Sequence, residues 1–159
     1  KVLFSIIMKK TNFQKLKKIE QSLLQKAFGA MDNSYNPYSK FYVGAAILDS
    51  ENKIFVGTNV ENAAYGNTIC AECSALTSAR AGGVKKIVKI AVIGKSFKKA
   101  VLDPVSPCGS CRQMIFEVSQ VSGNDIEVIM SNTKMDKIII AKISELLPLG
   151  FGPNNFKSK

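Results

Sequence analysis

Three cysteines and one glutamate stand in a pattern typical of a catalytic zinc site. Cys70 and Glu72 belong to a C-A-E triplet, and Cys108 and Cys111 to a later P-C-G-S-C segment. Three thiolates leave one position of a tetrahedral zinc ion open to water. A glutamate beside that position can accept a proton from the water and pass it to a leaving group. The pattern therefore predicts one Zn²⁺ per chain, held by Cys70, Cys108 and Cys111, with Glu72 as the proton carrier.

A fourth cysteine, Cys73, leaves a second interpretation open. Cys70 and Cys73 form one C-x-x-C pair, Cys108 and Cys111 form another, and four cysteines around one ion make a closed structural zinc site. Against this, residues 71–72 contain none of the glycine or proline that helps a zinc-binding turn to bend. A chain of 159 residues also buries a core without a metal. We therefore expect the open catalytic site, with Cys73 beside it.

Composition bounds the function classes. A length of 159 residues with 46% hydrophobic residues predicts one domain with a substantial core, and no segment approaches the roughly 20 apolar residues of a membrane span. The chain has no histidine, which excludes Ser-His and Cys-His catalysis and any imidazole metal ligand. Four cysteines, three of them in one motif, are typical of an intracellular metal site and not of a disulfide framework. We expect a cytoplasmic location.

The net charge of +10 raises the question of nucleic acid as a partner. The lysines gather near the two ends of the chain and in turns, and no aromatic residues alternate with them as in a base-stacking surface. A solvated, lysine-rich surface is the better interpretation, so we expect no nucleic-acid partner.

Hydrophobic spacing and turn residues predict the elements. Asn12 is a candidate N-cap for one amphipathic helix that continues to Met31. The other expected elements are strands 42–48 and 54–60 in an antiparallel hairpin, a helix from Cys70 to Gly82, strand 87–94, helix 108–120, strands 126–130 and 137–141, and a short helix at 144–147. This order predicts an α/β fold in three layers, with a mixed five-stranded sheet and helices on both faces. Residues 12–153 form the single domain, after an N-terminal extension (1–11) without a function and before a tail (154–159).

The expected layout places all three cysteines at helix starts. Cys70 begins one helix, and Cys108 and Cys111 lie in the first turn of the next. Helix N-termini carry partial positive charge, which stabilises thiolates and lowers their pKa. If the strands between these helix starts are parallel, both starts lie at the same edge of the sheet and the three sulfurs can converge.

At these residues the chain resembles the small, homotetrameric, zinc-dependent cytidine deaminases of pyrimidine salvage. The resemblance extends from about Leu16 to Pro153. It rests on segments 37–46, 59–63, 70–72, 106–113, 146–148 and 151–153. It implies the cytidine deaminase-like fold, a homotetramer, and hydrolytic deamination of cytidine and deoxycytidine to uridine and deoxyuridine plus ammonia.

The resemblance also assigns substrate contacts. Asn59 and Glu61 correspond to the residues that hold the ribose hydroxyls, and side chains two apart on a strand end face the same way. Phe41 corresponds to the aromatic residue on the pyrimidine face, and the backbone around Ala71 to the group that orients the base amide edge. Tyr65 and Phe151 correspond to residues that contact a neighbouring subunit.

One position departs from the family. Cys73 stands where these enzymes usually carry an arginine that hydrogen-bonds the zinc thiolates. Three thiolates on Zn²⁺ leave a net charge of −1, so the helix N-termini, with Gln113, must offset it without that arginine. Two alternatives stay open at this point: a deaminase of another cytosine nucleoside such as blasticidin S, and a non-enzymatic four-cysteine zinc module.

Overall fold

The computed structural model describes residues 8–156, which contain one six-stranded sheet. The first seven residues, part of the expected extension, and the last three of the expected tail lie outside the described residues. The strands are β1 (Lys9–Thr11), β2 (Phe41–Asp49), β3 (Ile54–Thr58), β4 (Ile87–Ser96), β5 (Glu127–Ser131) and β6 (Ile138–Lys142). The α-helices are α1 (Lys18–Ala30), α2 (Ala71–Ala81), α3 (Gly109–Ser122) and α4 (Ile143–Leu146).

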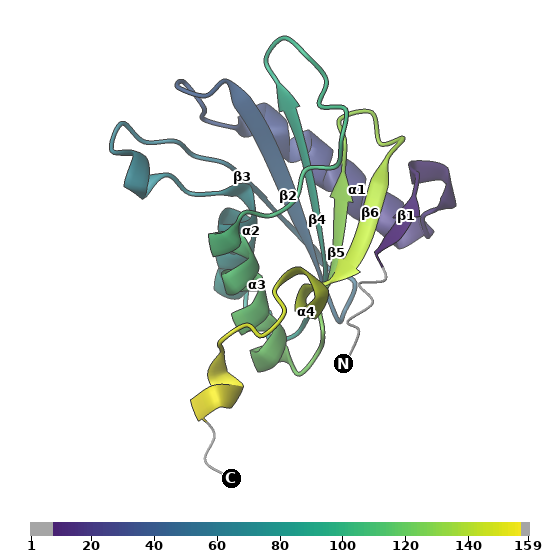
Figure 1. Ribbon diagram of the computed structural model, residues 1–159, viewed down its shortest axis with the longest axis vertical. Coiled ribbons are helices and arrows are strands. Elements are labelled where there is room, and N and C mark those ends of the chain that lie inside the picture. The colour runs from purple at the N-terminus through teal and green to yellow at the C-terminus, as the bar shows by residue number, and fades with distance from the viewer. Residues whose placement is uncertain (1–7, 157–159) are drawn as a thin grey trace.

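The sheet is mixed, as predicted, with strand order β1-β6-β5-β4-β2-β3 (Figure 1). Strands β4 and β5 are parallel, and each of the other neighbouring pairs is antiparallel. The predicted hairpin is confirmed as β2 and β3, in which Gly44 pairs with Thr58 and Leu48 with Ile54. Since β2 is antiparallel to both β3 and β4, the strands β3 and β4 run in the same direction.

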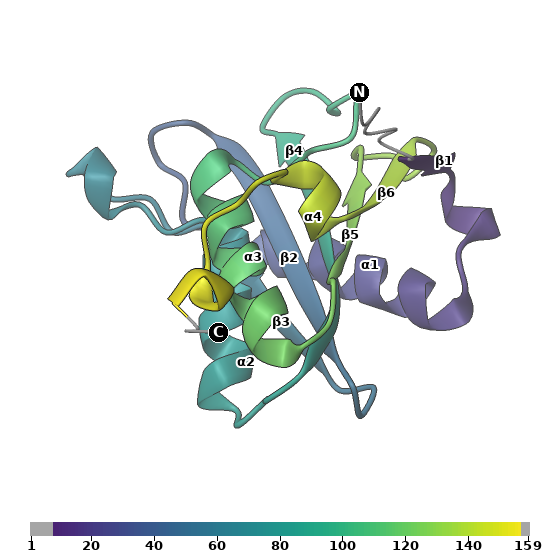
Figure 2. The same cartoon turned by 60° about the horizontal axis from the view of Figure 1, so that its bottom comes forward.

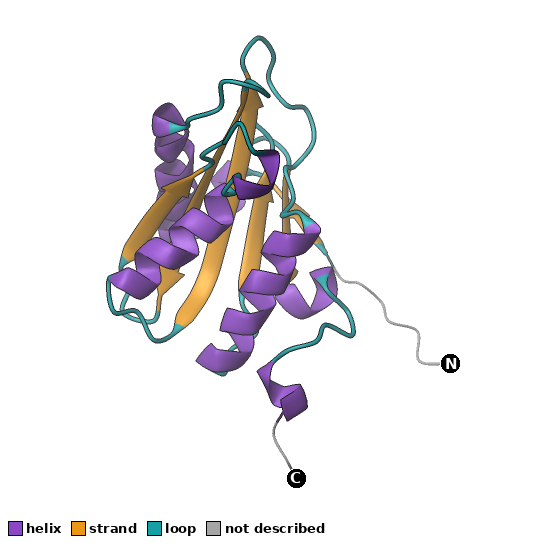
Figure 3. Ribbon diagram, turned by 90° about the vertical axis from the view of Figure 1, so that its left-hand side faces the viewer, coloured by secondary structure: helices purple, strands orange, loops and turns teal. Residues whose placement is uncertain are grey.

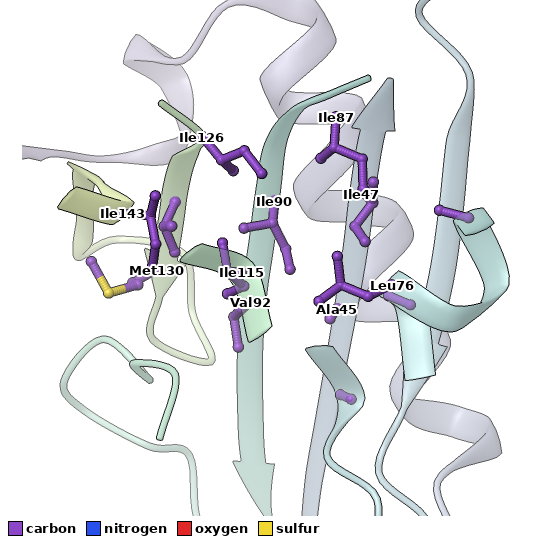
Figure 4. Close-up of a cluster of buried hydrophobic side chains, with 14 of the residues drawn as sticks. Ala45, Ile47, Leu76, Ile87, Ile90, Val92, Ile115, Ile126, Met130 and Ile143 are labelled. Atoms are coloured by element: carbon purple, nitrogen blue, oxygen red, sulfur yellow. The ribbon is translucent and has the colours of Figure 1, made fainter. Parts of the chain in front are cut away.

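Helices cover both faces of the sheet, so the three-layer expectation holds. Helix α1 lies on one face, and α2, α3 and α4 lie on the other (Figure 1, Figure 2, Figure 3). One buried cluster fills the space between the sheet and α2, α3 and α4, with residues such as Ile90, Leu76 and Ile115 (Figure 4). A second cluster, which includes Leu23 and Ile129, lies between the sheet and α1. The two clusters account for the alternation of apolar residues along the central strands.

Two glycines let helices approach the hairpin closely. A Cβ atom on Gly44 would lie 1.9 Å from the carbonyl oxygen of Ala27 in α1, and one on Gly57 would lie 2.2 Å from the backbone nitrogen of Ala75 in α2. Any side chain at these positions would force a helix away from the sheet. Gly57 thereby sets the distance between β3 and the helix whose start carries Cys70.

Two predictions about the N-terminal region were wrong. The sheet has six strands and not five, because Lys9–Thr11 pairs with β6 at the sheet edge. The single helix expected from Asn12 to Met31 is broken: Asn12 caps only a short 3-10 turn, and Leu16 has extended backbone angles (φ −73°, ψ 150°). Helix α1 begins two residues later, where the Glu20 carboxylate accepts the backbone N–H of Lys17 at 3.0 Å.

The remaining predicted helices and strands agree with the structure to within about two residues at each end. Among residues 8–156, none of the helices has the length and apolar character needed to cross a membrane.

Candidate active site

The direction of the strands brings the two cysteine-bearing helix starts together. Helix α2 follows β3, and helix α3 follows β4. Because β3 and β4 run in the same direction, both helices start at the same end of the strands. Cys70 is the N-cap of α2 and Cys108 the N-cap of α3, while Cys111 is the third residue of α3. The thiols therefore lie where the backbone N–H groups of two helix starts point.

Within the described residues, Cys70, Cys108 and Cys111 form a group whose sulfur atoms all lie within 4.8 Å of one another. Zinc–sulfur bonds of about 2.3 Å in a tetrahedron put the sulfurs about 3.8 Å apart, which lies within this limit. Thiolates are also the ligands that select zinc among the abundant divalent ions. The residues fit a zinc ion with three protein ligands.

Hydrogen bonds among the three thiols govern their protonation. The hydrogen bond with Cys111 lowers the pKa of Cys70 to about 7. The same hydrogen bond, together with burial, raises the pKa of Cys111. Metal ligation requires thiolates, so a bound cation displaces the protons of these sulfurs.

Cys73 lies beside this group and outside it, as expected for a residue one helical turn after Cys70. Its sulfur is 3.8 Å from that of Cys111, and it is not one of the three mutually close sulfurs. The side chain is half-buried, and burial raises the pKa of its thiol. The two sulfurs lie within hydrogen-bonding distance, and either thiol can be the donor.

Glu72 is a buried carboxylate next to the thiols. It is the second residue of α2 and only 4% exposed, and burial raises its pKa. A carboxyl group that moves protons near neutral pH works best when its pKa is raised in this way. Its position in the first turn explains how a buried carboxylate is tolerated, since the helix N-terminus favours negative charge.

Glu72, Cys70 and Cys108 open into a cavity of about 320 Å³. This volume is at the lower end of the range for small-molecule sites. The predicted residues Phe41, Asn59, Glu61 and Ala71 all line it as well. The remaining lining residues are Ser39, Val43, Thr68, Val105 and Ser106. The structure thus gathers into one cavity Glu72, two of the three predicted zinc ligands and the residues predicted for substrate contact, while the buried Cys111 does not line it.

The two predicted sugar-binding side chains already have protein partners. Asn59 is buried: its Oδ1 accepts the backbone N–H of Val43 at 2.9 Å and the Ser34 hydroxyl, and its Nδ2 donates to the Phe41 carbonyl at 2.9 Å. One N–H of the Asn59 amide has no partner among these contacts. The amide thus ties β2 to the end of β3.

Glu61 is held by the turn before β2. Its carboxylate accepts the backbone N–H groups of Tyr38 at 3.0 Å and Ser39 at 3.2 Å, and the Ser39 hydroxyl. The hydroxyl hydrogen bond is the main cause that lowers the pKa of Glu61. The group is therefore an oriented, ionised acceptor at the mouth of the cavity.

Besides Cys73 and Cys111, three predicted residues do not line the cavity. The Tyr65 ring is 75% exposed and stands edge-on to Tyr38, with ring centres 5.8 Å apart. The Phe151 ring is 60% exposed and stands edge-on to Phe156 at 5.2 Å. Gln113 donates from Nε2 to the Phe151 carbonyl at 2.8 Å, which ties the C-terminal segment to α3.

Sequence reasoning did not single out Val105, Ser106 or Thr68 as parts of the cavity. Ser106 is adjacent to the P-C-G-S-C segment, and that adjacency was the available signal. Val105 and Thr68 lie in irregular segments, where no periodicity shows which side chains face inward. The positively charged Arg112 is near the thiols in sequence, yet its guanidinium donates to the carbonyls of Pro107 at 2.9 Å and Leu146 at 3.1 Å.

Comparison with known proteins agrees with this geometry. A family model of the cytidine and deoxycytidylate deaminase zinc-binding region matches residues 17–122. The chain is 40% identical to the cytidine deaminase of Halalkalibacterium halodurans over 131 residues, which cover 82% of this chain and 92% of the relative. It is 39% identical to that of Sporosarcina psychrophila, with 82% and 90% covered.

Solved structures agree as well. The cytidine deaminase of Burkholderia pseudomallei superposes with a TM-score of 0.72 at 39% identity, covering 82% of this chain and 97% of that one. The cytidine deaminase of Mycobacterium tuberculosis superposes with a TM-score of 0.67 at 30% identity, covering 84% and 98%. The predicted fold, zinc cofactor and enzyme class are confirmed, and the chain belongs to the cytidine and deoxycytidylate deaminase family of zinc-binding enzymes.

Proposed function

We propose that this enzyme hydrolyses the C4 amino group of cytidine and deoxycytidine, giving uridine and deoxyuridine plus ammonia, as a step of pyrimidine salvage. One observation carries the proposal: the buried carboxylate of Glu72 shares a cavity of about 320 Å³ with Cys70 and Cys108, two of the three ligand cysteines. The names of the relatives support the substrate class.

The cysteines Cys70, Cys108 and Cys111 hold the zinc ion. When bound, this ion serves as a Lewis acid, which polarises a water molecule and lowers the pKa of that water toward neutrality. The two helix N-termini offset the negative charge of the three thiolates. The S–H group of Cys73, 3.8 Å from the Cys111 sulfur, adds one weak donor at the position where the family usually has arginine.

Glu72 moves the protons of the reaction. Its carboxylate accepts a proton from the attacking water and delivers protons to N3 of the ring and to the departing amino group. Phe41 packs on the pyrimidine face, and the backbone of Ala71 orients the amide edge of the base. Both residues line the cavity together with Glu72.

The sugar is recognised at the other side of the cavity. The remaining N–H of the Asn59 amide donates to one ribose hydroxyl, and the Glu61 carboxylate accepts from another. The hydrogen bonds from Tyr38 and Ser39 hold that carboxylate in one orientation before the substrate binds. Sites built around hydroxyl groups reject analogues that lack them, so a free base should be a poor substrate.

The catalytic domain comprises residues 12–153 together with the edge strand β1 (Lys9–Thr11). It works as a homotetramer in which Tyr65 and Phe151 contact a neighbouring subunit. Gln113 supports the second of these contacts by fixing the Phe151 carbonyl. All four cysteines are free thiols, which fits a reducing cytoplasm.

A direct assay tests the function. The purified zinc-loaded enzyme is mixed with cytidine, deoxycytidine, blasticidin S and free cytosine in separate cuvettes, and the loss of ultraviolet absorbance of the cytosine ring is followed. We expect turnover of the first two nucleosides, little of free cytosine, and loss of activity with a zinc chelator. Turnover of blasticidin S alone would replace the proposed substrate, and no turnover of any would contradict the proposal.

A further inference from the structure

The loop that joins β4 to α3 carries the cavity wall and one zinc ligand. Residues 97–107 contain no helix or strand, yet they bring Val105 and Ser106 to the cavity and end at Cys108. A ligand on a long irregular segment needs external support, because errors of about 1 Å in a site cost large factors in rate. The contacts of this loop identify that support.

The turn between β5 and β6 binds the first half of the loop. The Thr133 hydroxyl accepts the backbone N–H of Val101 at 2.8 Å and donates to the Gly94 carbonyl at 2.6 Å. The backbone N–H of Thr133 also donates to the Val101 carbonyl at 3.2 Å. One hydroxyl thus joins the end of β4 to the loop that leaves it.

Residues next to Thr133 bind the second half. The Asn132 side chain is buried, and its Nδ2 donates to the Leu102 carbonyl at 3.2 Å. The carbonyl of Ser131 accepts the backbone N–H of Val105 at 3.1 Å. Three consecutive residues therefore hold the loop at positions 101, 102 and 105, immediately before Cys108.

These contacts reach the substrate cavity through Gly94. A Cβ atom at Gly94 would lie 3.1 Å from both the Phe41 ring and the Val105 side chain, so these two groups meet above its backbone. The Thr133 hydroxyl is bonded to the carbonyl of that same glycine. A shift of the Gly94 carbonyl or of Val101 would therefore move both the cavity wall and the loop backbone that leads to Cys108.

We propose that Thr133, with Asn132 beside it, is a positioning residue of the active site: its hydroxyl fixes the 97–107 loop so that Val105 shapes the substrate cavity and Cys108 meets the other zinc ligands. Thr133 does not line the cavity and acts through the loop. The inference rests on the proposed function for its substrate and on the three-cysteine site for its metal.

Isosteric substitution tests the hydroxyl. Thr133→Val keeps the shape and removes both side-chain hydrogen bonds, while Thr133→Ser keeps the hydroxyl and loses a methyl group. The measurements are the rate at which the loaded enzyme transfers zinc to an excess of chelating dye, and kcat and KM for cytidine. We expect Thr133→Val to lose zinc about tenfold faster, with a raised KM and a lowered kcat, as for other supports of metal ligands. Thr133→Ser should restore most of the wild-type values.

Ser119 provides a matched control. Its hydroxyl also bridges two backbone groups, donating to the Asn124 carbonyl at 2.7 Å and accepting from the N–H of Ile126, but at the opposite end of β5. Ser119→Ala should lower the stability to urea comparably and leave zinc transfer and KM unchanged. If the packing of valine disturbs Thr133→Val, Thr133→Ala provides the same comparison with Thr133→Ser.

Two results would overturn the inference. Wild-type zinc transfer, kcat and KM in Thr133→Val and Thr133→Ala would show that the hydroxyl positions nothing. Equal acceleration of zinc loss in Ser119→Ala would show that only global stability matters. Failure of the proposed function is a separate result, since it would appear as an inactive wild-type enzyme, whereas the zinc-transfer rates need no substrate.

Discussion

At the scale of single residues, Glu72 combines burial, a raised pKa and proximity to the ligand thiols. Glu72→Gln keeps the size and hydrogen-bonding capacity of the side chain but cannot accept a proton. We expect the variant to fold and to retain its zinc. Its kcat for cytidine should fall by about 10²- to 10⁴-fold, the usual contribution of one general acid–base group. Steady-state kinetics measure the loss of kcat, and elemental analysis measures the retained zinc. Near-normal turnover would show that another group moves the protons.

The role of Cys73 decides whether the zinc site is open, with three cysteine ligands, or closed, with four. Its sulfur contacts only that of Cys111, at 3.8 Å, among the described contacts, so we expect the metal to have three sulfur ligands and one light atom. Zinc-edge X-ray absorption counts these directly. Cys73→Ala should retain zinc, whereas Cys108→Ala, which removes a ligand, should lose it.

Four sulfurs around the ion, or zinc loss in Cys73→Ala, would contradict this assignment. A further variant, Cys73→Arg, should turn over cytidine at least as fast as the wild type. The guanidinium would partly neutralise the three thiolates and strengthen the zinc ion as a Lewis acid.

Some site residues could be predicted from the sequence and others could not. The thiols and Glu72 were predictable because zinc chemistry restricts both residue type and spacing. The hydrogen bonds that commit most of the Asn59 amide to Val43 and Phe41 were not, since they depend on how the end of β3 meets β2. The role of Thr133 depends in the same way on a contact between residues about 30 positions apart.

At the scale of elements, the contact between β3 and α2 places the first zinc ligand. Gly57→Ala should push α2 outward, because the new Cβ would lie 2.2 Å from the backbone nitrogen of Ala75. We expect a loss of about 1–3 kcal/mol in the free energy of unfolding, as for other overpacked sites, and weaker zinc binding. Urea unfolding followed by circular dichroism, with a zinc titration, measures both.

Gly29→Ala is the control for this substitution. Gly29 also lies in an element of this fold, helix α1, but a Cβ atom there would meet no atom within 4 Å. Alanine should raise the stability by roughly 0.5–1 kcal/mol through its higher helix propensity. If Gly57→Ala and Gly29→Ala changed the free energy of unfolding and zinc binding equally, close packing at Gly57 would not be the cause.

The start of α1 depends on an ion pair on the opposite face of the sheet from α2 and α3. Lys89 contacts Glu20 at 3.0 Å and also Glu127. Burial alone would raise the pKa of Glu20, but hydrogen bonds from Lys17 and Lys89 outweigh it and lower that pKa. Burial alone would lower the pKa of Lys89, and hydrogen bonds with Glu127 and Glu20 outweigh it and raise that pKa.

The pH dependence of stability follows from these directions. The contribution of Glu20 is present above its unfolded pKa of about 4.3 and is lost as the pH falls through the lower folded pKa. The contribution of Lys89 is present below about pH 10.4 and is lost as the pH rises through the higher folded pKa. Lys89→Met should therefore cost about 2 kcal/mol near neutral pH and less below about pH 4. Urea midpoints at several pH values check this, and a pH-independent difference would contradict it.

The elements themselves were predictable in unequal measure. Helices α2 and α3 could be predicted because cap residues and apolar spacing agree within each segment. The break at Leu16 could not, because the apolar period continues across it. One tertiary and one local contact fix the break: Phe13 donates its N–H to the Met135 carbonyl, and the Glu20 carboxylate caps the start of α1 by accepting the N–H of Lys17. The edge strand Lys9–Thr11 has too few residues to show an alternating pattern.

At the scale of the whole molecule, the sheet topology creates the site. Strand β2 is antiparallel to both of its neighbours, β3 and β4, so β3 and β4 run in the same direction. The helices that follow these two strands therefore start side by side. A mixed sheet was predictable from the order of the elements, and the convergence of the cysteines followed from parallel strands. Which edges remain free for another chain could not be predicted, since the added strand β1 changes one edge.

The outer surface of one chain leaves several large apolar side chains exposed. Two edge-on aromatic pairs stand out: Tyr38 with Tyr65, and Phe151 with Phe156. The first pair borders a hollow of about 410 Å³ that shares Glu61 and Ser39 with the substrate cavity. Rings exposed to this degree beside a small-molecule site are typical of surfaces that another protein chain covers.

We therefore expect a homotetramer of about 69 kDa, four chains of 17.3 kDa each, by size exclusion with light scattering. Tyr65→Ser and Phe151→Ala each remove a large apolar contact, so both should shift the mass toward smaller species and lower kcat/KM together. Val121→Ala, at an exposed apolar residue of α3 that belongs to neither pair, should change neither mass nor rate. A wild-type protein that remains monomeric with full activity would contradict the assembly, because each subunit would then complete its own site.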